Sequence, residues 1–270
     1  MIRSRLAAGG LSLVVASSVV GGFAPDASAA QAVVTVLQFN ASEGTGTCPD
    51  PVGTDCLSPL RGANANRDMY AVEEVCRADF TRFRKQTGWH GFFREQTTRL
   101  KGATGTGCVH KGEMLVSPHR VTGQRAYSLS SGFTKGHIRH HYLLVCGLIH
   151  AAPAFYGCST HLVFPRPDRS RTQVANLVKD TAAYRRHGRV VVAGDFNIAE
   201  SSGGAGATPR LKPVVGAGYQ ETDKSKQPTH GTRKFDYIFY FGAGGVQQRA
   251  ALTGDVATSD HKVLIGQARI

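Results

Sequence analysis

Several short segments place polar side chains at the ends of apolar runs, where they could carry chemistry. They are Gln38-Phe39-Asn40, Thr160-His161-Leu162, Gly194-Asp195-Phe196-Asn197 and Ser259-Asp260-His261, together with Glu73-Glu74 and Asp236. Strand ends are where α/β enzymes place their ligands. These positions are therefore the first candidates for a functional site.

The residue types in this set favour metal-assisted hydrolysis of a phosphate ester. Carboxylate and amide oxygens are hard ligands that suit Mg²⁺, Mn²⁺ or Ca²⁺ better than zinc. Two histidines, His161 and His261, offer acid–base chemistry near neutral pH. A buried carboxylate such as Asp236 can orient a histidine and stabilise its charged form. Together with an amide that holds a phosphate oxygen, these groups suffice for hydrolysis.

Each candidate also has a purely structural explanation. Asp195 and Asn197 could form an Asx turn, and Asp260 could cap the last strand. His161 could be a core histidine within an apolar strand. Asp236 is harder to explain in this way, because a buried carboxylate needs a partner. The full set in this order is far more specific than any one member.

The elements that must position these residues alternate between strands and helices. Apolar or β-branched runs predict strands at 32–39, 92–93, 114–116, 142–149, 155–162, 190–193, 235–241 and 262–270. Helical spacing predicts helices at 69–86, whose start also fits a strand, and at 171–186. Residues 41–67 are predicted to form a long loop. This alternation predicts an α/β domain with sheets buried between layers.

The chain has 270 residues, of which 41% are apolar and 19% charged, as in soluble globular proteins. Residues 1–30 have a basic start, an apolar run and an Ala27-Ser28-Ala29 cleavage signal. They predict a secretory signal peptide, so residues 31–270 are expected to form a single extracellular domain. An N-terminal anchor helix is the alternative.

Six cysteines agree with export, because an even number in an exported protein indicates disulfides. The sequential pairing is predicted: Cys48–Cys56, Cys76–Cys108 and Cys146–Cys158. The last pair has a geometric argument, since strands 142–149 and 155–162 would form a hairpin with these two residues nearly opposite.

The formal charge is +13, from 32 Lys and Arg against 19 Asp and Glu. Removal of Arg3, Arg5 and Asp26 with the leader takes away two positive charges and one negative, leaving +12 on the mature chain. Such a charge favours an anionic partner, either nucleic acid or an anionic lipid surface.

The candidate residues also occur in a recognisable order. It runs Asn40, Glu74, Ser-Thr-His-Leu at 159–162, Gly-Asp-Phe-Asn at 194–197, Phe-Asp-Tyr-Ile-Phe at 235–239 and Ser-Asp-His at 259–261. Over residues 33–270 this order resembles the endonuclease/exonuclease/phosphatase superfamily, which includes deoxyribonuclease I, and in detail its secreted actinobacterial members. The resemblance implies an α/β four-layer sandwich of two packed mixed β-sheets flanked by helices.

The resemblance also implies a role for each matched position. Asn40, Glu74 and Asp260 match metal-side residues. Asp195 matches the residue that orients or deprotonates the attacking water, and Asn197 matches a phosphate-contacting amide. His261, paired with Asp236, matches the catalytic histidine, and His161 matches the histidine near the leaving oxygen. Glu73 is a second carboxylate beside Glu74, which is preferred because it precedes Val75 in the motif.

The leading hypothesis is a secreted, monomeric nuclease that uses Mg²⁺, Mn²⁺ or Ca²⁺ to cut DNA, with RNA left open, and has no stable protein partner. The alternative is a phosphodiesterase or phosphatase acting on a phospholipid or a small phosphorylated substrate, in the manner of sphingomyelinases. The apolar hairpin tip at Ala151–Tyr156 could then touch a membrane. A third hypothesis, a binding protein without activity, is disfavoured because every matched position keeps the expected residue type.

Overall fold

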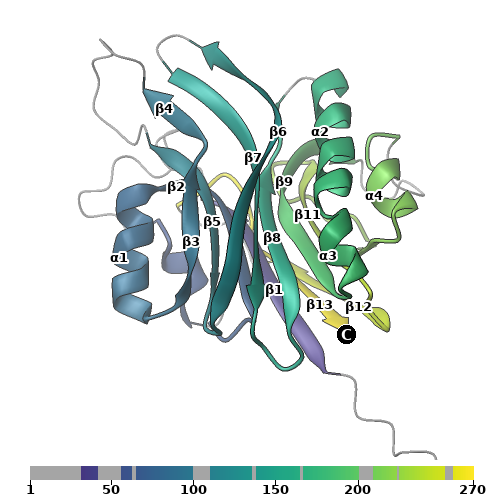
Figure 1. The fold of residues 1–270 in the computed structure, drawn as a ribbon. Coiled ribbons are helices and arrows are strands. Elements are labelled where there is room, and N and C mark those ends of the chain that lie inside the picture. Colours follow the sequence, from purple (N-terminus) through teal and green to yellow (C-terminus); the bar gives the residue numbers. More distant parts are fainter. Residues whose placement is uncertain are drawn as a thin grey trace, which may run out of the picture. The chain divides into compact units, whose positions relative to one another are not determined.

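Two mixed β-sheets pack face to face, and helices cover their outer faces (Figure 1). The computed structural model describes residues 32–41, 56–62, 65–99, 110–135, 138–164, 167–200, 209–223, 225–252 and 258–270. The predicted α/β fold of two packed mixed sheets flanked by helices is therefore confirmed. The predicted signal peptide lies outside the described residues and stays a prediction.

The first sheet has six strands in the order β12-β13-β1-β2-β5-β3. Its strands are β1 (Val33–Asn40), β2 (Met69–Cys76), β3 (His90–Glu95), β5 (Lys111–Ser117), β12 (Gly245–Leu252) and β13 (Leu264–Arg269). β1 and β2 are parallel, and the other neighbours are antiparallel. The parallel pair therefore brings the carboxyl ends of β1 and β2 to the same edge.

The second sheet has seven strands, six of them in the order β10-β11-β9-β8-β7-β4, with β6 also pairing with β7. They are β4 (Thr97–Arg99), β6 (Val121–Lys135), β7 (Ile138–Ile149), β8 (Phe155–His161), β9 (Val190–Glu200), β10 (Gln220–Glu221) and β11 (Lys234–Phe241). β8 and β9 are its parallel pair. Their connection carries α2 (Pro167–Asp180) and α3 (Ala182–Arg186).

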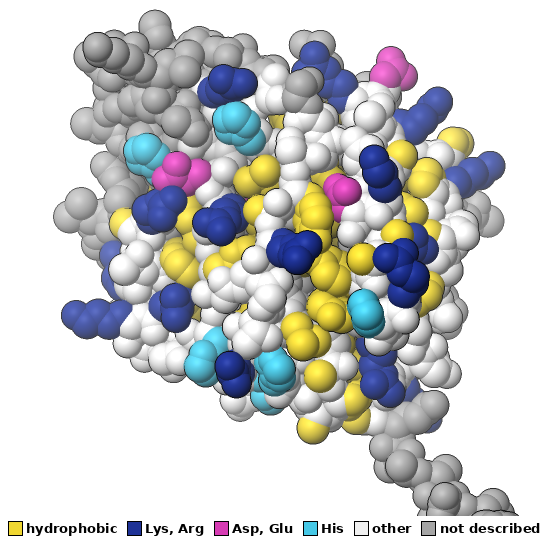
Figure 2. Space-filling model, in the orientation of Figure 1, with side chains coloured by type: hydrophobic (Ala, Val, Ile, Leu, Met, Phe, Trp, Pro, Cys, Tyr) yellow, Lys and Arg dark blue, Asp and Glu magenta, His cyan; other side chains and the backbone are white. Residues whose placement is uncertain are grey.

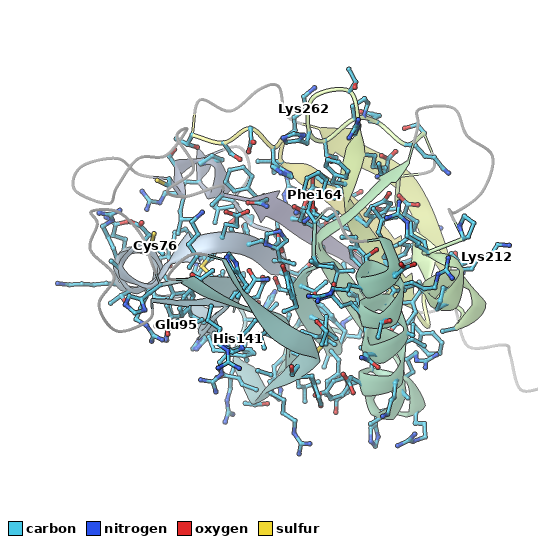
Figure 3. The ribbon with its side chains drawn as sticks, turned by 90° about the horizontal axis from the view of Figure 1, so that it is seen from above. Cys76, Glu95, His141, Phe164, Lys212 and Lys262 are labelled. Carbon is cyan, nitrogen blue, oxygen red and sulfur yellow. A yellow bond between two sulfur atoms is a disulfide. The ribbon has the colours of Figure 1, made fainter. Side chains whose placement is uncertain are left out.

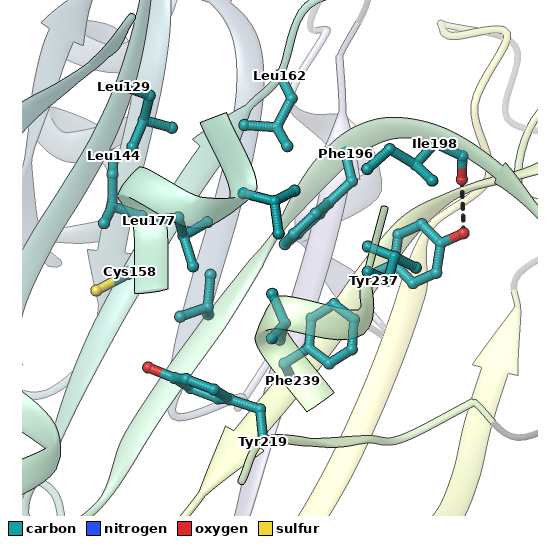
Figure 4. Packing of buried hydrophobic residues seen from close by; sticks show 14 of the residues in the cluster. Leu129, Leu144, Cys158, Leu162, Leu177, Phe196, Ile198, Tyr219, Tyr237 and Phe239 are labelled. Carbon is teal, nitrogen blue, oxygen red and sulfur yellow. Dashed lines mark hydrogen bonds between the residues drawn. The ribbon is translucent and has the colours of Figure 1, made fainter. Parts of the chain in front are cut away.

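Three apolar clusters hold the layers together. One lies between the sheets and includes Val36, Leu115 and Ile238. The second joins α2, α3 and α4 (Lys212–Gly216) to the outer face of the seven-stranded sheet, and Figure 4 shows Leu177 of α2 beside Phe196 and Phe239 of the sheet. The third packs α1 (Arg77–Thr87) and the short helix η1 (Ser58–Leu60) on the six-stranded sheet.

Of the two interpretations of 69–86, the strand at its start is confirmed: the first half forms β2, and only the second half is helical. This strand pairs with β1 on one side and β5 on the other, and nearly all of its residues are buried. A central strand buried on both faces is apolar at most positions, so some of its residues also match helical spacing. The helix begins only at Arg77 and ends at Thr87, and it is followed by Gly88, whose left-handed backbone (φ 69°) suits a helix C-terminus.

The strand predicted at 190–193 does not stop at Gly194 but continues as β9 to Glu200. Gly194 has a φ of +156°, and a Cβ there would overlap the carbonyl oxygen of Thr160. Glycine is therefore required for β9 to pass this close to β8. The strands β4, β6, β10 and β12 were not predicted from the sequence.

The hairpin of β7 and β8 places Cys146 directly opposite Cys158, and the predicted disulfide between them is confirmed. Cys56 and Cys76 are also disulfide-bonded. Their predicted partners, Cys48 and Cys108, lie outside the described residues, so these two pairings stay predictions. Within the described part of the chain, no helix has both the length and the apolar character needed to cross a membrane.

Candidate active site

The predicted site residues gather at one edge of the two sheets, where they are carried by β1, β2, β8, β9 and β11 and by the segment before β13. Figure 3 looks onto this edge from above. In the second sheet, Asp195 of β9 is the register partner of His161 on β8 and of Asp236 on β11. In the first sheet, Asn40 is the register partner of Glu73. The pairing of neighbouring strands thus sets the spacing of these side chains.

Asp195 lies at the centre of the cluster. Its Oδ2 accepts a hydrogen bond from Asn40 Nδ2 at 3.0 Å and lies 3.5 Å from His161 Nε2 and 3.8 Å from His261 Nε2. Its Oδ1 accepts a hydrogen bond from the backbone N–H of Asn197 at 2.8 Å. One carboxylate therefore faces both histidines while its other oxygen is fixed by the backbone.

Burial raises the pKa of Asp195 above its usual value, and the negative charge of Asp236 adds to this effect. The charges of His161 and His261 act in the opposite direction without cancelling it. A raised pKa makes the Asp195 carboxylate a better proton acceptor than an exposed aspartate.

Asp236 and His261 form a buried pair. His261 Nδ1 lies 2.8 Å from Asp236 Oδ2, and both side chains are almost inaccessible. Burial acts to lower the pKa of His261, but the charge of Asp236 and the hydrogen bond to it outweigh burial and raise this pKa to about 10. Burial in turn acts to raise the pKa of Asp236, yet the positive charge of His261 lowers it overall. His261 is therefore the protonated partner at neutral pH.

The backbone around His261 is also held firmly. The His261 N–H donates to Ser259 Oγ at 3.0 Å, and that hydroxyl donates to the carbonyl oxygen of Asn40 at 2.6 Å. This contact ties the Ser-Asp-His segment to the end of β1. It connects the histidine to the first sheet, whereas Asp236 connects it to the second.

Glu74 lies beside Asn40 at the end of β2. Asn40 Nδ2 lies 3.4 Å from Glu74 Oε1, and His161 Nε2 lies 4.0 Å from the same oxygen. Lys111 Nζ pairs with Glu74 Oε2 at 2.6 Å. Burial acts to raise the pKa of Glu74, but the positive charges of His161 and Lys111 lower it overall. The side chain is thus an ionised carboxylate.

The local backbone explains why Glu73 and Glu74 differ. The pairing of β2 with β5 is interrupted by a bulge between Val72 and Val75, and Glu74 has a φ of +54°. Bulges re-aim side chains and are common beside active sites. Glu73 is completely buried, whereas the Glu74 side chain keeps 20% exposure. Glu74 is therefore the accessible carboxylate of the two.

Asn197 shows the geometry of an Asx turn with Asp195 and a φ of +50°. Its Nδ2 donates to the carbonyl oxygen of Leu162 at 2.9 Å. The Asx turn that offered a purely structural explanation for Asp195 and Asn197 is therefore present. The phosphate-contacting role of Asn197 stays a prediction.

Asp260 lies on the more exposed side of His261. Its Oδ2 is 3.1 Å from His230 Nε2, and its side chain is 49% exposed. The His230 ring lies 4.7 Å from the His261 ring between centroids. The structure thus places Asp260 with two histidines, and the metal-binding role predicted for it stays a prediction.

No role at the site was predicted for Gln38, Ser159 or Glu113. Gln38 Nε2 donates to Glu73 Oε2 at 2.8 Å and to Asp236 Oδ1 at 2.6 Å. Ser159 Oγ lies 3.1 Å from Glu73 Oε1 and 3.2 Å from Glu113 Oε2. Gln38 and Ser159 each precede a predicted site residue by two positions, so they share its face of the strand. That spacing was the signal that could have found them.

The side chains of the cluster fit a divalent cation. Asn40, Glu74 and Asp195 carry hard oxygens, and Asn40 contacts both carboxylates. Asp195, Asp236 and His261 also have potential ligand atoms that all lie within 4.8 Å of one another, and while His261 is protonated only the two carboxylates of this group can bind a metal. Acidic residues of the site could therefore hold a metal, and their oxygen chemistry suits Mg²⁺, Mn²⁺ or Ca²⁺.

No protein-family model and no curated protein matches the chain. Solved structures do. An endonuclease/exonuclease/phosphatase from Beutenbergia cavernae matches with 17% identity and a TM-score of 0.67, covering 88% of this chain and 72% of that one. The human Nocturnin catalytic domain with bound sulfate matches with 15% identity and a TM-score of 0.65, covering 87% and 94%.

A third match is D. rerio TDP2 complexed with single-strand DNA product, with 14% identity and a TM-score of 0.61, covering 88% of this chain and all of that one. The protein therefore has the endonuclease/exonuclease/phosphatase fold, which is that of deoxyribonuclease I. At this level of identity the likeness concerns the fold.

Proposed function

We propose that this protein is a secreted, divalent-metal-dependent phosphodiesterase that hydrolyses nucleic acid, with DNA as the first substrate to test and RNA as the second. One observation carries the proposal: the Asp195 carboxylate faces both His161 and His261, and Asp236 holds His261 from behind. This arrangement provides a proton acceptor and a charged imidazole within one small site.

The side chains divide the work of in-line attack by water. Asp195 orients the water and accepts its proton, since burial raises its pKa. His261 is protonated and stabilises the charge that develops on the phosphoryl group. His161, whose Nε2 approaches the same oxygen of Asp195 as His261, acts on the leaving oxygen. A cation held by Asn40 and Glu74 would supply further charge stabilisation when bound.

Charge supports nucleic acid as the substrate. The whole chain carries +13, and Lys and Arg side chains are spread over the face in Figure 2, where acidic side chains are few. Phosphate backbones bind such surfaces through electrostatics. The TDP2 structure with its single-strand DNA product is a property of that protein, but it is compatible with the same substrate class here.

The lipid alternative receives less support from the hairpin tip between β7 and β8. Phe155 is buried, with 1% exposure, and Ala151 packs against the cluster between the sheets. The tip also lies at the opposite end of β8 from His161, about 20 Å away along the seven-residue strand. A membrane contact there would not bring a headgroup to the site.

A plasmid-nicking assay tests the proposal. We expect nicking with Mg²⁺ or Mn²⁺, loss with EDTA and recovery when metal is added again. His261→Ala should lower turnover about 10²–10⁴-fold. His150→Ala is the matched control, because His150 lies at the tip end of β7 and contacts Thr122.

Circular dichroism would confirm that both variants fold. Full activity of His261→Ala, or nicking that EDTA does not affect, would contradict the proposal. Release of headgroups from phospholipid vesicles without nicking would favour the lipid alternative instead.

A further inference from the structure

Phe164 is an exposed aromatic residue beside the candidate site. Its side chain is 52% exposed, and Val33 and Val215 are the other large apolar residues exposed among the described ones. Phe164 follows the catalytic candidate His161 by three positions, and Figure 3 shows it on the edge where the site lies. Single exposed apolar side chains are common at protein surfaces, so the significance of this ring lies in its place beside the site and in its contacts.

The backbone that carries this ring is held on several sides. The Leu162 N–H donates to the carbonyl oxygen of Asp195 at 2.9 Å, and the Leu162 carbonyl accepts from Asn197 Nδ2 at 2.9 Å. The Val163 N–H donates to Oε1 of the buried Gln173 at 2.8 Å. The segment before the ring is thus anchored to site residues and to α2, so the ring is presented from a fixed support.

Ring contacts lead from Phe164 to the catalytic candidates. Phe164 meets Phe235 in an edge-on contact with 5.8 Å between ring centroids. Phe235 lies 5.6 Å from His230, and His230 lies 4.7 Å from His261. Phe164, Phe235 and His230 thus form a row of contacting rings, which extends from the imidazole of His261 to the exposed ring of Phe164.

We propose that Phe164 stacks on an unpaired base of a single-stranded nucleic acid whose phosphodiester lies at Asp195 and His261. The inference rests on the proposed nuclease function and adds a specificity residue to it. The edge-on contact with Phe235 leaves Phe164 half exposed, and bases stack on exposed aromatic rings with little sequence preference. Bases within a duplex are already stacked on their neighbours, which favours a single strand.

One isolated ring fits a base better than it fits a lipid. Membrane binding strengthens with the apolar area that enters the bilayer. In the part of the chain that the structure describes, the other two large apolar residues that are exposed lie at the start of β1, which is the end of that strand opposite the site, and in α4. The observations therefore favour a nucleobase, and binding to lipid is an outcome that the test must detect.

The test combines the wild type and Phe164→Ala with intact and abasic strands. Thymidine hexanucleotides are compared with versions in which one base at a time is replaced by an abasic tetrahydrofuran. We expect Phe164→Ala to raise KM for the normal strand about tenfold. We also expect one abasic position to weaken the wild type by a similar factor and to have no further effect on Phe164→Ala. Phe164→Trp should retain wild-type KM, and Val215→Ala is the exposed apolar control.

Binding of fluorescein-labelled strands in EDTA, followed by anisotropy, gives a readout that is independent of cleavage. Additive effects of base removal and Phe164→Ala at every position, or an unchanged KM in Phe164→Ala, would overturn the inference while leaving the nuclease function intact. Loss of binding to phosphatidylserine vesicles in Phe164→Ala, with oligonucleotide binding unchanged, would also overturn it. A wild type that nicks plasmid but cuts no single-stranded oligonucleotide would overturn the inference alone. If the wild type cuts neither plasmid nor oligonucleotide with any metal, the proposed function itself fails.

Discussion

Glu113 is fully buried beneath the candidate site, next to Ser159. Burial raises its pKa well above the usual value of 4.5, and the negative charges of Asp195 and Glu74 add to this, despite the hydrogen bond from Ser159. The folded state therefore binds a proton more tightly than the unfolded state. Stability contributed at this position must fall as the pH rises above about 4.5 towards the raised pKa.

Glu113→Gln should remove this loss of stability at high pH, because the amide cannot ionise and keeps both the shape of the side chain and an acceptor oxygen for Ser159. We expect the variant to match the wild type near pH 4 and to exceed it by about 1 kcal/mol or more at pH 8. Urea unfolding at both pH values measures this difference. Glu95→Gln, at a partly exposed site paired with Arg77, should show no comparable rise. A Glu113→Gln variant that is less stable than the wild type at pH 8 would contradict the argument.

We expect removal of the Asp236 charge to reduce activity much more than it displaces His261. Asp236→Asn keeps the size of the side chain but removes the charge that raises the pKa of His261. We expect kcat to fall about 10²–10⁴-fold and the alkaline limit of activity to move down from the region of pH 10. A pH–rate profile measures both effects. Asp168→Asn on α2 is the control, and wild-type kcat in Asp236→Asn would refute the assignment.

At the scale of elements, two glycines with positive φ make contrasting predictions. Gly194→Ala would push a methyl group into the Thr160 carbonyl where β9 passes β8. We expect a loss of about 3 kcal/mol or more in unfolding free energy, together with reduced activity because Asp195 is the next residue. Gly188→Ala also has a positive φ, of +120°, but meets nothing within 4 Å, so about 1–2 kcal/mol is expected. Equal losses in urea unfolding would disprove this explanation.

The disulfide between Cys146 and Cys158 ties β7 to β8, the strand that ends at His161. Replacing both cysteines by Ala should lower the unfolding free energy by about 2–4 kcal/mol, because the bridge restricts the unfolded chain. Thermal unfolding of the double variant, with the wild type under reducing conditions as a comparison, measures the effect. An unchanged melting temperature would show that the hairpin does not need the bridge.

The sequence predicted the candidate site better than it predicted the elements. Asn40, His161, Asp195 and Asp236 could be found because each is a polar residue in or just after an apolar strand. No role was predicted for Gln38, because its hydrogen bond to Asp236 depends on how the second sheet packs against the first, which the sequence does not show. Likewise, Asp260 could not be placed against His230 from the sequence, since the two are brought together by the isolated pairing of His230 with His261.

The predicted limits of strands and helices were wrong where burial on both faces hides the alternation of apolar and polar residues. β2 is buried on both faces, so its apolar residues match a helix as well as a strand. β6 was not predicted for the opposite reason. Many of its residues between Val121 and Leu129 are exposed or half-buried, so it lacks an apolar run. The fold class survived these errors because it depends on the alternation of layers rather than on the ends of single strands.

At the scale of the whole molecule, the charge of +13 predicts a steep effect of salt. Positive side chains that bind phosphates displace counterions, so added salt weakens binding. We expect binding of a single-stranded oligonucleotide to weaken more than about tenfold between 50 and 200 mM NaCl. Anisotropy measures this, with thermal unfolding at both salt concentrations as the control. Affinity that does not change with salt would argue against an electrostatic nucleic-acid surface.

The shared register of His161, Asp195 and Asp236 has a consequence for how such a protein can diversify. The reacting groups are fixed by the ladder of the sheet itself, so the connecting segments around them can change in length and composition without rebuilding the chemistry. New substrates can then be acquired by exchanging the surroundings of an unchanged centre.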